Sequence, residues 1–382
     1  MKYHKILKSG LFSLPKSVPI EEDFRTFLFE LLDTYALKIS EPQNLFGDLK
    51  RGVIFDSGER VLSNKEAKTN SSYALKSIQT LIDSIKKCID SYYNGHPGEA
   101  FNIMSEGMKN ARIPSYLDKS YSFEANTNFY RIRFQDGRFP LIKKDLFHIP
   151  FQLRGKVKTQ RFSISGYPCL YLSNSIYTAW EELGRPQEND IQATRLINTS
   201  KLKFLDLTND FYVDDYLNHD SKDIKFLYKA ITWPLVAACS IKVNNPSDTF
   251  KPEYIIPQLL LQWVNKKSID GILYSSTHID KNNSNSLGRF WNMAIPVKSN
   301  GETGYCPELQ KLFKMTDVST LFLDKIAKGG ILFMFNREDI INPNIQQIDI
   351  SGGQPYMYHD SPLGRLELTT NGLNPEEINF NT

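Results

Sequence analysis

The chain has 382 residues, more than the usual domain size of about 100–200 residues, so its length predicts roughly two or three compact units. Its 46 basic and 43 acidic side chains leave a net charge of +3, a near balance that gives no long-range field favouring nucleic acid or an anionic membrane. The four cysteines form no CxxC pair and the six histidines are scattered, so we expect neither a disulfide framework nor a metal site.

No stretch of the sequence has the character of a signal peptide or a membrane span. The first residues, MKYHKILKSGLFSLPKS, are basic but contain no continuous apolar core. No later stretch approaches the roughly 18 apolar residues that a membrane span needs. We therefore expect a soluble cytoplasmic protein in a reducing compartment, with no membrane partner.

The N-terminal third has the periodicity of amphipathic helices. Apolar residues recur at three- and four-residue spacing in residues 21–40 and again in residues 71–93, where the pattern ends at an Asn-Gly pair. Pro97 suits the first turn of a further helix. We therefore predict a helical domain over residues 1–125, which packs and regulates rather than catalyses.

The character of the sequence changes near Thr127, where NFYRIRF alternates aromatic or aliphatic residues with basic ones. This alternation predicts a half-buried strand with Arg131 and Arg133 on one face, either as solvated charges or as anion contacts. A basic patch follows, in which one aspartate balances six cations: Lys143, Lys144, Arg154, Lys156, Lys158 and Arg161. Its local charge favours an anion, although a basic loop without a ligand would have the same composition.

A buried strand followed by a short helix comes next. A short apolar run predicts the strand, near whose end lies Tyr171. The helix is expected to begin at a cap, either Asn174 or Ser175, and to end before a Gly-Arg-Pro stop. Glu181 and Glu182 then lie in its last turn, where a carboxylate opposes the helix macrodipole at a cost of about 0.3–1 kcal/mol. Such departures from local preference are common at functional sites.

A second candidate strand ends in a polar cluster farther along the chain. Residues 269–274 have the character of a strand, and Ser275 and Ser276 follow them directly. A serine at the end of a strand is by itself only a turn former. Residues 301–382 show no separate chemistry, and we expect a C-terminal extension that packs on the core and ends in a flexible tail.

Together these motifs resemble a known family. The pattern RFSxxGxPCLYLxxSxxTAWEEL, with DGILYSS far downstream, resembles the RES family, which is named for its Arg, Glu and Ser and contains NAD-consuming toxins. The resemblance covers roughly residues 129–298, and it departs from the family where Phe162 replaces a common tryptophan. It implies an α+β fold with a split, twisted sheet like that of ADP-ribosyltransferases, as a catalytic domain over residues 126–300 after the helical domain.

The resemblance also implies site residues. Its motif positions are Arg161, Tyr171, Glu182 and a serine, for which DGILYSS selects Ser276. The arginine can bind phosphate or ribose oxygens in a bidentate manner, the tyrosine can stack on nicotinamide, and the glutamate can stabilise an oxocarbenium-like sugar. The serine would orient the substrate. The remaining candidates for substrate contacts are Arg131, Arg133 and Ser275.

The expected activity is cleavage of the nicotinamide–ribose bond of NAD by a glycohydrolase or phosphorylase. NAD is then a substrate, and no metal or cofactor is needed. Such a toxin would deplete NAD and be restrained by a cognate antitoxin or by its own helical domain, whose apolar surface also suits a homodimer. One alternative is a mono-ADP-ribosyltransferase that modifies a protein or a nucleotide. Another is a catalytically inactive module that binds RNA or protein.

The two adjacent glutamates are not equivalent in this interpretation. Neighbouring residues on a helix point about 100° apart, so only one of them can face a pocket. The family register places the motif glutamate eleven residues after Tyr171 (182 − 171 = 11), at Glu182. We therefore expect Glu182 to carry the chemistry and Glu181 to be solvated.

Overall fold

The chain folds into two compact units. The computed structural model describes residues 10–40, 53–55, 58–60, 64–116, 121–134, 140–210, 224–265, 269–280, 285–321, 342–351 and 353–380. One unit, here called the helical unit, consists of Met1–Ser120 and Leu205–Lys267. The other, called the sheet unit, consists of Tyr121–Phe204 and Ser268–Thr382. This division differs from the expected ranges 1–125, 126–300 and 301–382, because a segment from the middle of the sequence joins the N-terminal helices.

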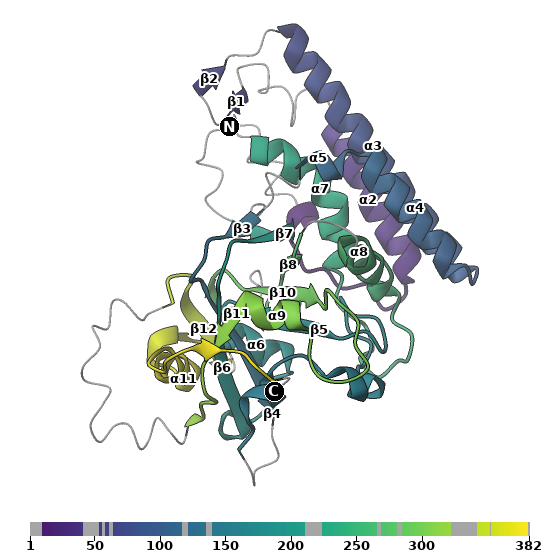
Figure 1. Cartoon of the computed structure of the whole chain (residues 1–382). Coiled ribbons are helices and arrows are strands. Elements are labelled where there is room, and N and C mark those ends of the chain that lie inside the picture. Colours follow the sequence, from purple (N-terminus) through teal and green to yellow (C-terminus); the bar gives the residue numbers. More distant parts are fainter. Residues whose placement is uncertain are drawn as a thin grey trace. The chain divides into compact units, whose positions relative to one another are not determined.

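The helical unit contains the predicted helices, drawn from purple to green in Figure 1. The pattern in residues 71–93 belongs to a longer helix, which is followed by a turn at Gly95 with φ of 81°. Two short strands pair as a hairpin. The elements are η1 (Gly10–Phe12), α2 (Phe24–Ser40), β1 (Val53–Phe55), β2 (Gly58–Arg60), α3 (Asn64–Tyr93), α4 (Pro97–Asn110), α5 (Ile113–Tyr116), α7 (Ile224–Cys239), η9 (Pro252–Tyr254) and α8 (Ile255–Asn265).

Aromatic packing explains why the middle segment belongs to the helical unit. Trp233 of α7 is fully buried and stacks on Tyr35 of α2 with ring centroids 4.1 Å apart. The Tyr35 hydroxyl donates to the carbonyl oxygen of Ala230 at 2.6 Å. Buried aromatic pairs of this kind contribute about 0.5–1.5 kcal/mol beyond the area that they bury. Helix α7 therefore completes the core that the N-terminal helices begin.

The sheet unit confirms the α+β prediction. Its large sheet has the strand order β14-β11-β6-β4-β5-β10-β8-β7-β3, and a smaller sheet has the order β13-β12-β9. The strands are β3 (Tyr121–Phe123), β4 (Asn128–Phe134), β5 (Cys169–Ser173), β6 (Ile191–Asn198), β7 (Leu202–Leu207), β8 (Gly271–Ser275), β9 (Leu287–Gly288), β10 (Trp291–Pro296), β11 (Phe313–Met315), β12 (Ile345–Ser351), β13 (Gln354–Met357) and β14 (Glu376–Glu377). The helices are η4 (Lys143–Leu146), η5 (Phe151–Lys156), α6 (Ile176–Glu182), η6 (Glu188–Asp190), α9 (Pro307–Leu312), η12 (Tyr358–Asp360) and α11 (Pro362–Asn371).

The large sheet opens between β4 and β5. Strand β4 pairs with β6 along its whole length, from Asn128 to Phe134. With β5 it shares a single registered pair, Tyr130 opposite Ser173. Beyond that pair the Arg131 guanidinium bridges the two strands, since its Nη1 donates to the Tyr171 carbonyl oxygen at 2.8 Å. The sheet is therefore divided into two paired halves that meet at one position.

The two faces of the sheet bury different cores. Residues directly opposite in a registered pair point to the same face, and neighbours along a strand alternate. One face, which includes Phe129 and Leu172, is covered by residues of η4, η5 and α9. The other face, which includes Tyr130, is covered by α6 and α11. We call this second surface the α6 face.

The C-terminal residues pack on the sheet as far as Phe380, in place of the expected flexible tail. Strand β14 pairs with β11, so that Glu377 lies opposite Lys314. Ile378 is buried, and the ring of Phe380 lies 5.2 Å from that of Tyr305. The reason is that these two apolar side chains extend the core on the face opposite α6.

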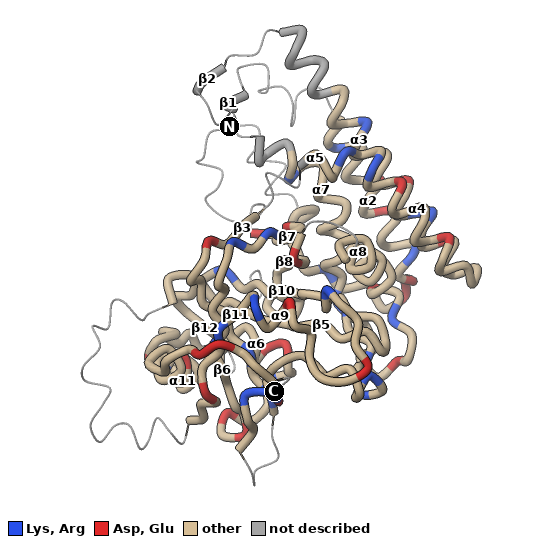
Figure 2. The backbone as a smooth tube through the Cα atoms, in the orientation of Figure 1, with Lys and Arg blue, Asp and Glu red and all other residues tan. Residues whose placement is uncertain are grey.

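Charges are distributed without a dominant sign. Figure 2 shows blue and red segments interspersed along the described backbone of both units. This distribution agrees with the near balance of basic and acidic residues. In the described part of the chain, no helix combines the length and the apolarity that crossing a membrane requires.

Candidate active site

Helix α6 starts and stops where the sequence predicts. The Ser175 side chain caps it by accepting from the Thr178 amide at 2.9 Å, which confirms the second of the two expected cap residues. Gly184, with φ of 77°, follows the last turn, and its amide donates to the Glu181 carbonyl at 3.0 Å. The helix is only seven residues long. Its stability must therefore come from tertiary packing rather than from propensity.

Glu182 lies in a polar cluster that joins three distant segments. The Ser276 hydroxyl donates to its Oε1 at 2.6 Å, and the Asn292 amide donates to the same oxygen at 3.0 Å. The Nε2 of His278 lies 4.0 Å from Oε2, which accepts no hydrogen bond from the described residues. The side chain is 28% exposed. One oxygen is thus fixed by the protein, while the other accepts no hydrogen bond from the described residues and belongs to a partly exposed side chain.

Ser276 is itself held in place. Its amide donates to the Phe290 carbonyl at 2.9 Å, one residue beyond the end of β8. Its hydroxyl oxygen accepts from the His278 amide at 3.2 Å, while the same hydroxyl donates its hydrogen bond to Glu182. Both functions of the hydroxyl are therefore used, and its direction toward the carboxylate is defined.

Tyr274 shares this neighbourhood. It lies opposite Asn292 in register, so both side chains point to the α6 face. Burial raises the pKa of the Tyr274 hydroxyl well above its ordinary value. Among its neighbours, Glu182 and Tyr171 raise this pKa further and Arg161 lowers it. The motif residues therefore act electrostatically on one buried phenol.

Arg161 is 9% exposed and lies at the same end of β8. Its Nη2 donates to Thr277 Oγ1 at 3.3 Å, and Thr277 directly follows Ser276. Phe162, which replaces the tryptophan common in the family, is fully buried and packs on Tyr274 with ring centroids 4.5 Å apart. An aromatic ring at this position therefore still supports the segment that carries the arginine.

The structure does not join three other candidates to this cluster. Ser275 lies opposite Trp291 in register, so it points away from the α6 face. Arg131 and Arg133 alternate with Tyr130 along β4, so both side chains leave the strand on the face opposite the α6 face. Burial, followed by the effect of Arg133, lowers the pKa of Arg131 to about 9. The Nη2 of Arg133 donates to the Phe147 carbonyl at 3.5 Å. Both arginines therefore bond backbone carbonyls within the sheet unit rather than the cluster around Glu182.

Glu181 is not solvated, and that expectation is wrong. Its side chain is 3% exposed, and it forms a two-point ion pair with Arg185, whose Nε and Nη2 donate to it at 2.9 and 2.8 Å. The guanidinium also donates to the Asp349 carbonyl at 3.1 Å. The reason is that Arg185, just after α6, pairs with Glu181 and is itself held by the Asp349 carbonyl of β12, so the side of the helix next to Glu182 is closed as well.

The sequence reasoning missed Asn292, Tyr274, Thr277 and His278. Asn292 is the single amide in the apolar strand β10, which is a signal that could have marked it. Tyr274 stands inside the DGILYSS motif. Thr277 and His278 belong to the following turn, and nothing in the local pattern points to them.

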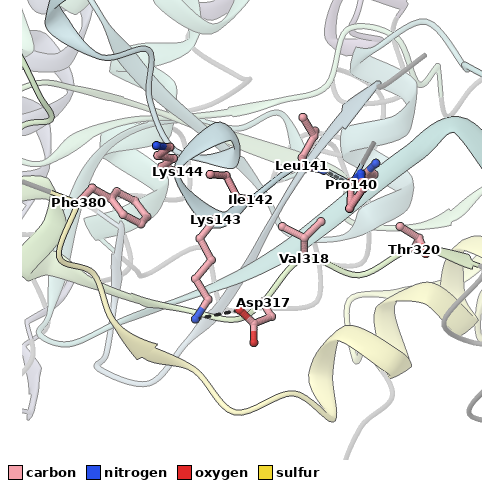
Figure 3. Close-up of a pocket in the computed structure, with 10 residues that line it drawn as sticks. Pro140, Leu141, Ile142, Lys143, Lys144, Asp317, Val318, Thr320 and Phe380 are labelled. Atoms are coloured by element: carbon pink, nitrogen blue, oxygen red, sulfur yellow. Dashed lines mark hydrogen bonds and ion pairs between the residues drawn. The ribbon is translucent and has the colours of Figure 1, made fainter. Parts of the chain in front are cut away.

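A cavity of about 780 Å³ lies elsewhere on the sheet unit (Figure 3). Its lining is mostly apolar and contains none of the residues around Glu182. Lys143 of the predicted basic patch reaches it but pairs with Asp317 at 3.1 Å and with Glu376. The lining residues are Pro140, Leu141, Ile142, Lys143, Lys144, Gln192, Asp317, Val318, Thr320 and Phe380. Among the residues that the structure describes, no group of three or more His, Cys, Asp or Glu is placed to hold a metal ion.

Comparisons with known proteins agree with the motif. The family model described as RES domain matches residues 128–296. A Bacillus subtilis (strain 168) protein named "Putative toxin YopC" is 33% identical to this chain over 319 residues, which cover 78% of this chain and 70% of that protein. No solved structure matches the chain significantly. With the motif cluster assembled and a relative of this identity covering most of both chains, the chain belongs to the RES domain family.

Proposed function

We propose that the protein cleaves the nicotinamide–ribose bond of NAD and acts as a toxin by depleting NAD. The observation that carries this proposal is the hydrogen bond of 2.6 Å between Ser276 and Glu182, which joins the two motifs across 94 positions of sequence. Family membership supports the same activity. The printed name of the Bacillus subtilis relative supports action as a toxin.

The geometry around Glu182 suits a sugar cation. In the reaction, the bond between C1′ of the ribose and the ring nitrogen breaks, and both electrons leave with the neutral nicotinamide. No general acid is needed for this departure. With Oε1 fixed by Ser276 and Asn292, Oε2 can stabilise the positive charge that develops on the ribose.

Binding of NAD falls to the other motif residues in this proposal. Arg161 contacts the phosphates or the ribose, and Tyr171 stacks on the nicotinamide ring. Water then adds to C1′ and releases a proton in a glycohydrolase, whereas phosphate adds in a phosphorylase. We also propose a cognate antitoxin as a protein partner. Homodimerisation through the helical unit fits its exposed apolar side chains, such as Leu37, which is 68% exposed.

One experiment separates the possible activities. The full chain is incubated with NAD labelled in the adenine, and the products are identified over time. Free ADP-ribose, or ADP-ribose that carries a phosphate on the same ribose carbon when phosphate is present, supports the proposal. Label retained on a protein or a nucleotide would instead support an ADP-ribosyltransferase. Unchanged NAD, with a folded chain, would contradict both and favour a binding module.

A further inference from the structure

The N-terminus of α6 is completed by residues from far along the chain. The first amide of the helix, that of Ile176, donates to Glu367 Oε2 at 2.8 Å. The second, that of Tyr177, donates to the Tyr358 hydroxyl at 3.4 Å. Only the third, that of Thr178, has a local partner, Ser175. Free amides at a helix start must find acceptors, and here two of the acceptors lie beyond the family match at residues 128–296.

Glu367 is a buried carboxylate surrounded by donors. It is 2% exposed, and no ion pair with the described residues reaches it. Its Oε1 accepts from Asn342 Nδ2 at 2.9 Å, and its Oε2 also accepts from the Tyr358 hydroxyl at 2.5 Å. The Asn342 amide donates in addition to the Asn174 carbonyl at 2.7 Å, just before α6. The charge is thus offset by hydrogen bonds and by the positive end of the helix.

Burying an acid without a counterion costs free energy, and an apolar side chain would fill the same space at lower cost. The acid is therefore explained by what only a carboxylate does here, which is to accept from several donors at once. One of these donors is the first amide of α6. The other two, Tyr358 and Asn342, themselves bond the backbone at the start of the helix. Because α6 has seven residues, its last residue, Glu182, lies about 9 Å along the axis from the first.

We propose that Glu367 is a positioning residue for the reaction at Glu182: its carboxylate holds α6 in the register in which Glu182 meets Ser276. This inference rests on the proposed NAD cleavage. A short rigid helix transmits a shift at its start directly to its end, and the fixed oxygen of Glu182 depends on two hydrogen bonds with narrow geometry. Glu367 does not touch the substrate in this proposal.

The protonation state of Glu367 gives a readout. Burial raises its pKa to about 7, while its hydrogen bonds, that from Tyr358 first, oppose the shift. The titratable groups that face it are Tyr358 of η12 and Tyr130 of β4, and burial raises both of their pKa values well above the ordinary value. Arg195 of β6 interacts with Tyr130. Glu367 is then the group of this cluster that changes charge near neutral pH, and only its ionised form accepts from all its donors.

The test compares Glu367→Gln with Glu377→Gln, a matched change at an exposed residue of β14 that does not touch α6. We expect Glu367→Gln to lower kcat about tenfold at pH 8, with little change in KM. In wild type, kcat should fall as the pH drops below about 7, because Glu367 is then protonated. This fall, the acidic limb of the pH profile, should be lost in Glu367→Gln, while Glu377→Gln should keep the wild-type profile. Tyr358→Phe removes a hydrogen bond that lowers the pKa of Glu367, so its acidic limb should move to higher pH.

A readout that does not need NAD separates this inference from the proposed function. Amide hydrogen exchange in residues 176–178 should be about tenfold faster in Glu367→Gln at pH 8 than in wild type or Glu377→Gln. Faster exchange in a chain that leaves NAD intact would support the positioning role of Glu367 and overturn the proposed cleavage of NAD. A folded Glu367→Gln with wild-type exchange and a wild-type pH profile would overturn the positioning role of Glu367. If that variant does not fold, an unmoved acidic limb in Tyr358→Phe overturns it.

Discussion

The two ends of α6 are built from different parts of the chain. At its C-terminal end, Glu182 meets Ser276 and Asn292, which both lie within the family match. At its N-terminal end, Ile176 meets Glu367, which lies outside that match. The first end carries the carboxylate that we propose for the reaction and is partly exposed, whereas the second is buried. The difference teaches that a family motif can define a site whose support comes from residues outside the part of the chain that the family model matches.

The largest expected effect is at the exposed end. Glu182→Gln keeps the size of the side chain but removes the negative charge that stabilises the sugar cation, so kcat for NAD cleavage should fall by orders of magnitude with little change in NAD affinity. Nicotinamide release and NAD binding would both be measured. Glu377→Gln is the control, and thermal melting must match the parent. Wild-type turnover in a folded Glu182→Gln would remove this residue from the chemistry.

A smaller effect is expected for Arg161, which tests how the substrate is held beside that end. Arg161→Ala should weaken NAD binding more than Arg161→Lys, because lysine keeps the charge but loses the planar fork that matches paired oxygens. Calorimetric titration with NAD would measure both. Equal affinities for wild type and the two variants would mean that other residues bind the phosphates.

Glu181 tests whether the middle of α6 is structural. Glu181→Gln should lower the free energy of unfolding by about 1–2 kcal/mol, a discounted figure because Arg185 is 42% exposed and can be solvated. Urea unfolding would measure this loss. For folded protein, NAD turnover should stay close to wild type. A large loss of turnover without a loss of stability would assign Glu181 to the reaction and contradict the comparison.

The buried carboxylate of Glu367, at the N-terminal end of α6, should make the free energy of unfolding depend on pH. A glutamate in an unfolded chain has a pKa of about 4.3, whereas burial raises that of Glu367 to about 7 in the folded protein. Between these values the folded protein binds one more proton than the unfolded chain, so its free energy of unfolding should fall as the pH rises. Above about 7 this contribution should level off.

Unfolding of wild type and Glu367→Gln across this pH range would measure that slope. The slope should be smaller in the variant, and the variant should be no less stable than wild type at pH 8. Identical slopes would show that Glu367 does not titrate there. These outcomes would mean that the ionised carboxylate lowers stability at the pH at which we propose that it holds α6, as expected of a group kept for function.

Sequence was sufficient for features that depend on local chemistry. The cap at Ser175, the stop at Gly184 and the strand around Arg131 follow from backbone preferences, and each is present in the structure, although both faces of that strand are buried rather than one. The choice of Ser276 followed from a family motif, and the structure places its hydroxyl on Glu182. Whether that pair performs the chemistry stays a prediction.

Features that depend on contacts between residues far apart in the chain could not be predicted from the sequence. The burial of Glu181 accompanies its ion pair with Arg185, which the Asp349 carbonyl of β12 holds, and the periodicity of a seven-residue helix cannot show how many of its faces are covered. The placement of Glu367 is a contact across 191 positions with no local pattern on either side. The membership of α7 in the helical unit depends likewise on Trp233 stacking on Tyr35, a match of shapes rather than of spacing.

The distance in sequence between Ile176 and Glu367 has a consequence for synthesis of the protein. A ribosome makes Glu182 and Ser276 long before it makes Glu367, so a growing chain carries the motif residues while the start of α6 still lacks its acceptors. Nascent chains, and chains that terminate early, would hold the helix loosely and cleave little NAD. A cell that makes an NAD-cleaving toxin with this arrangement would thereby be spared the activity of incomplete products.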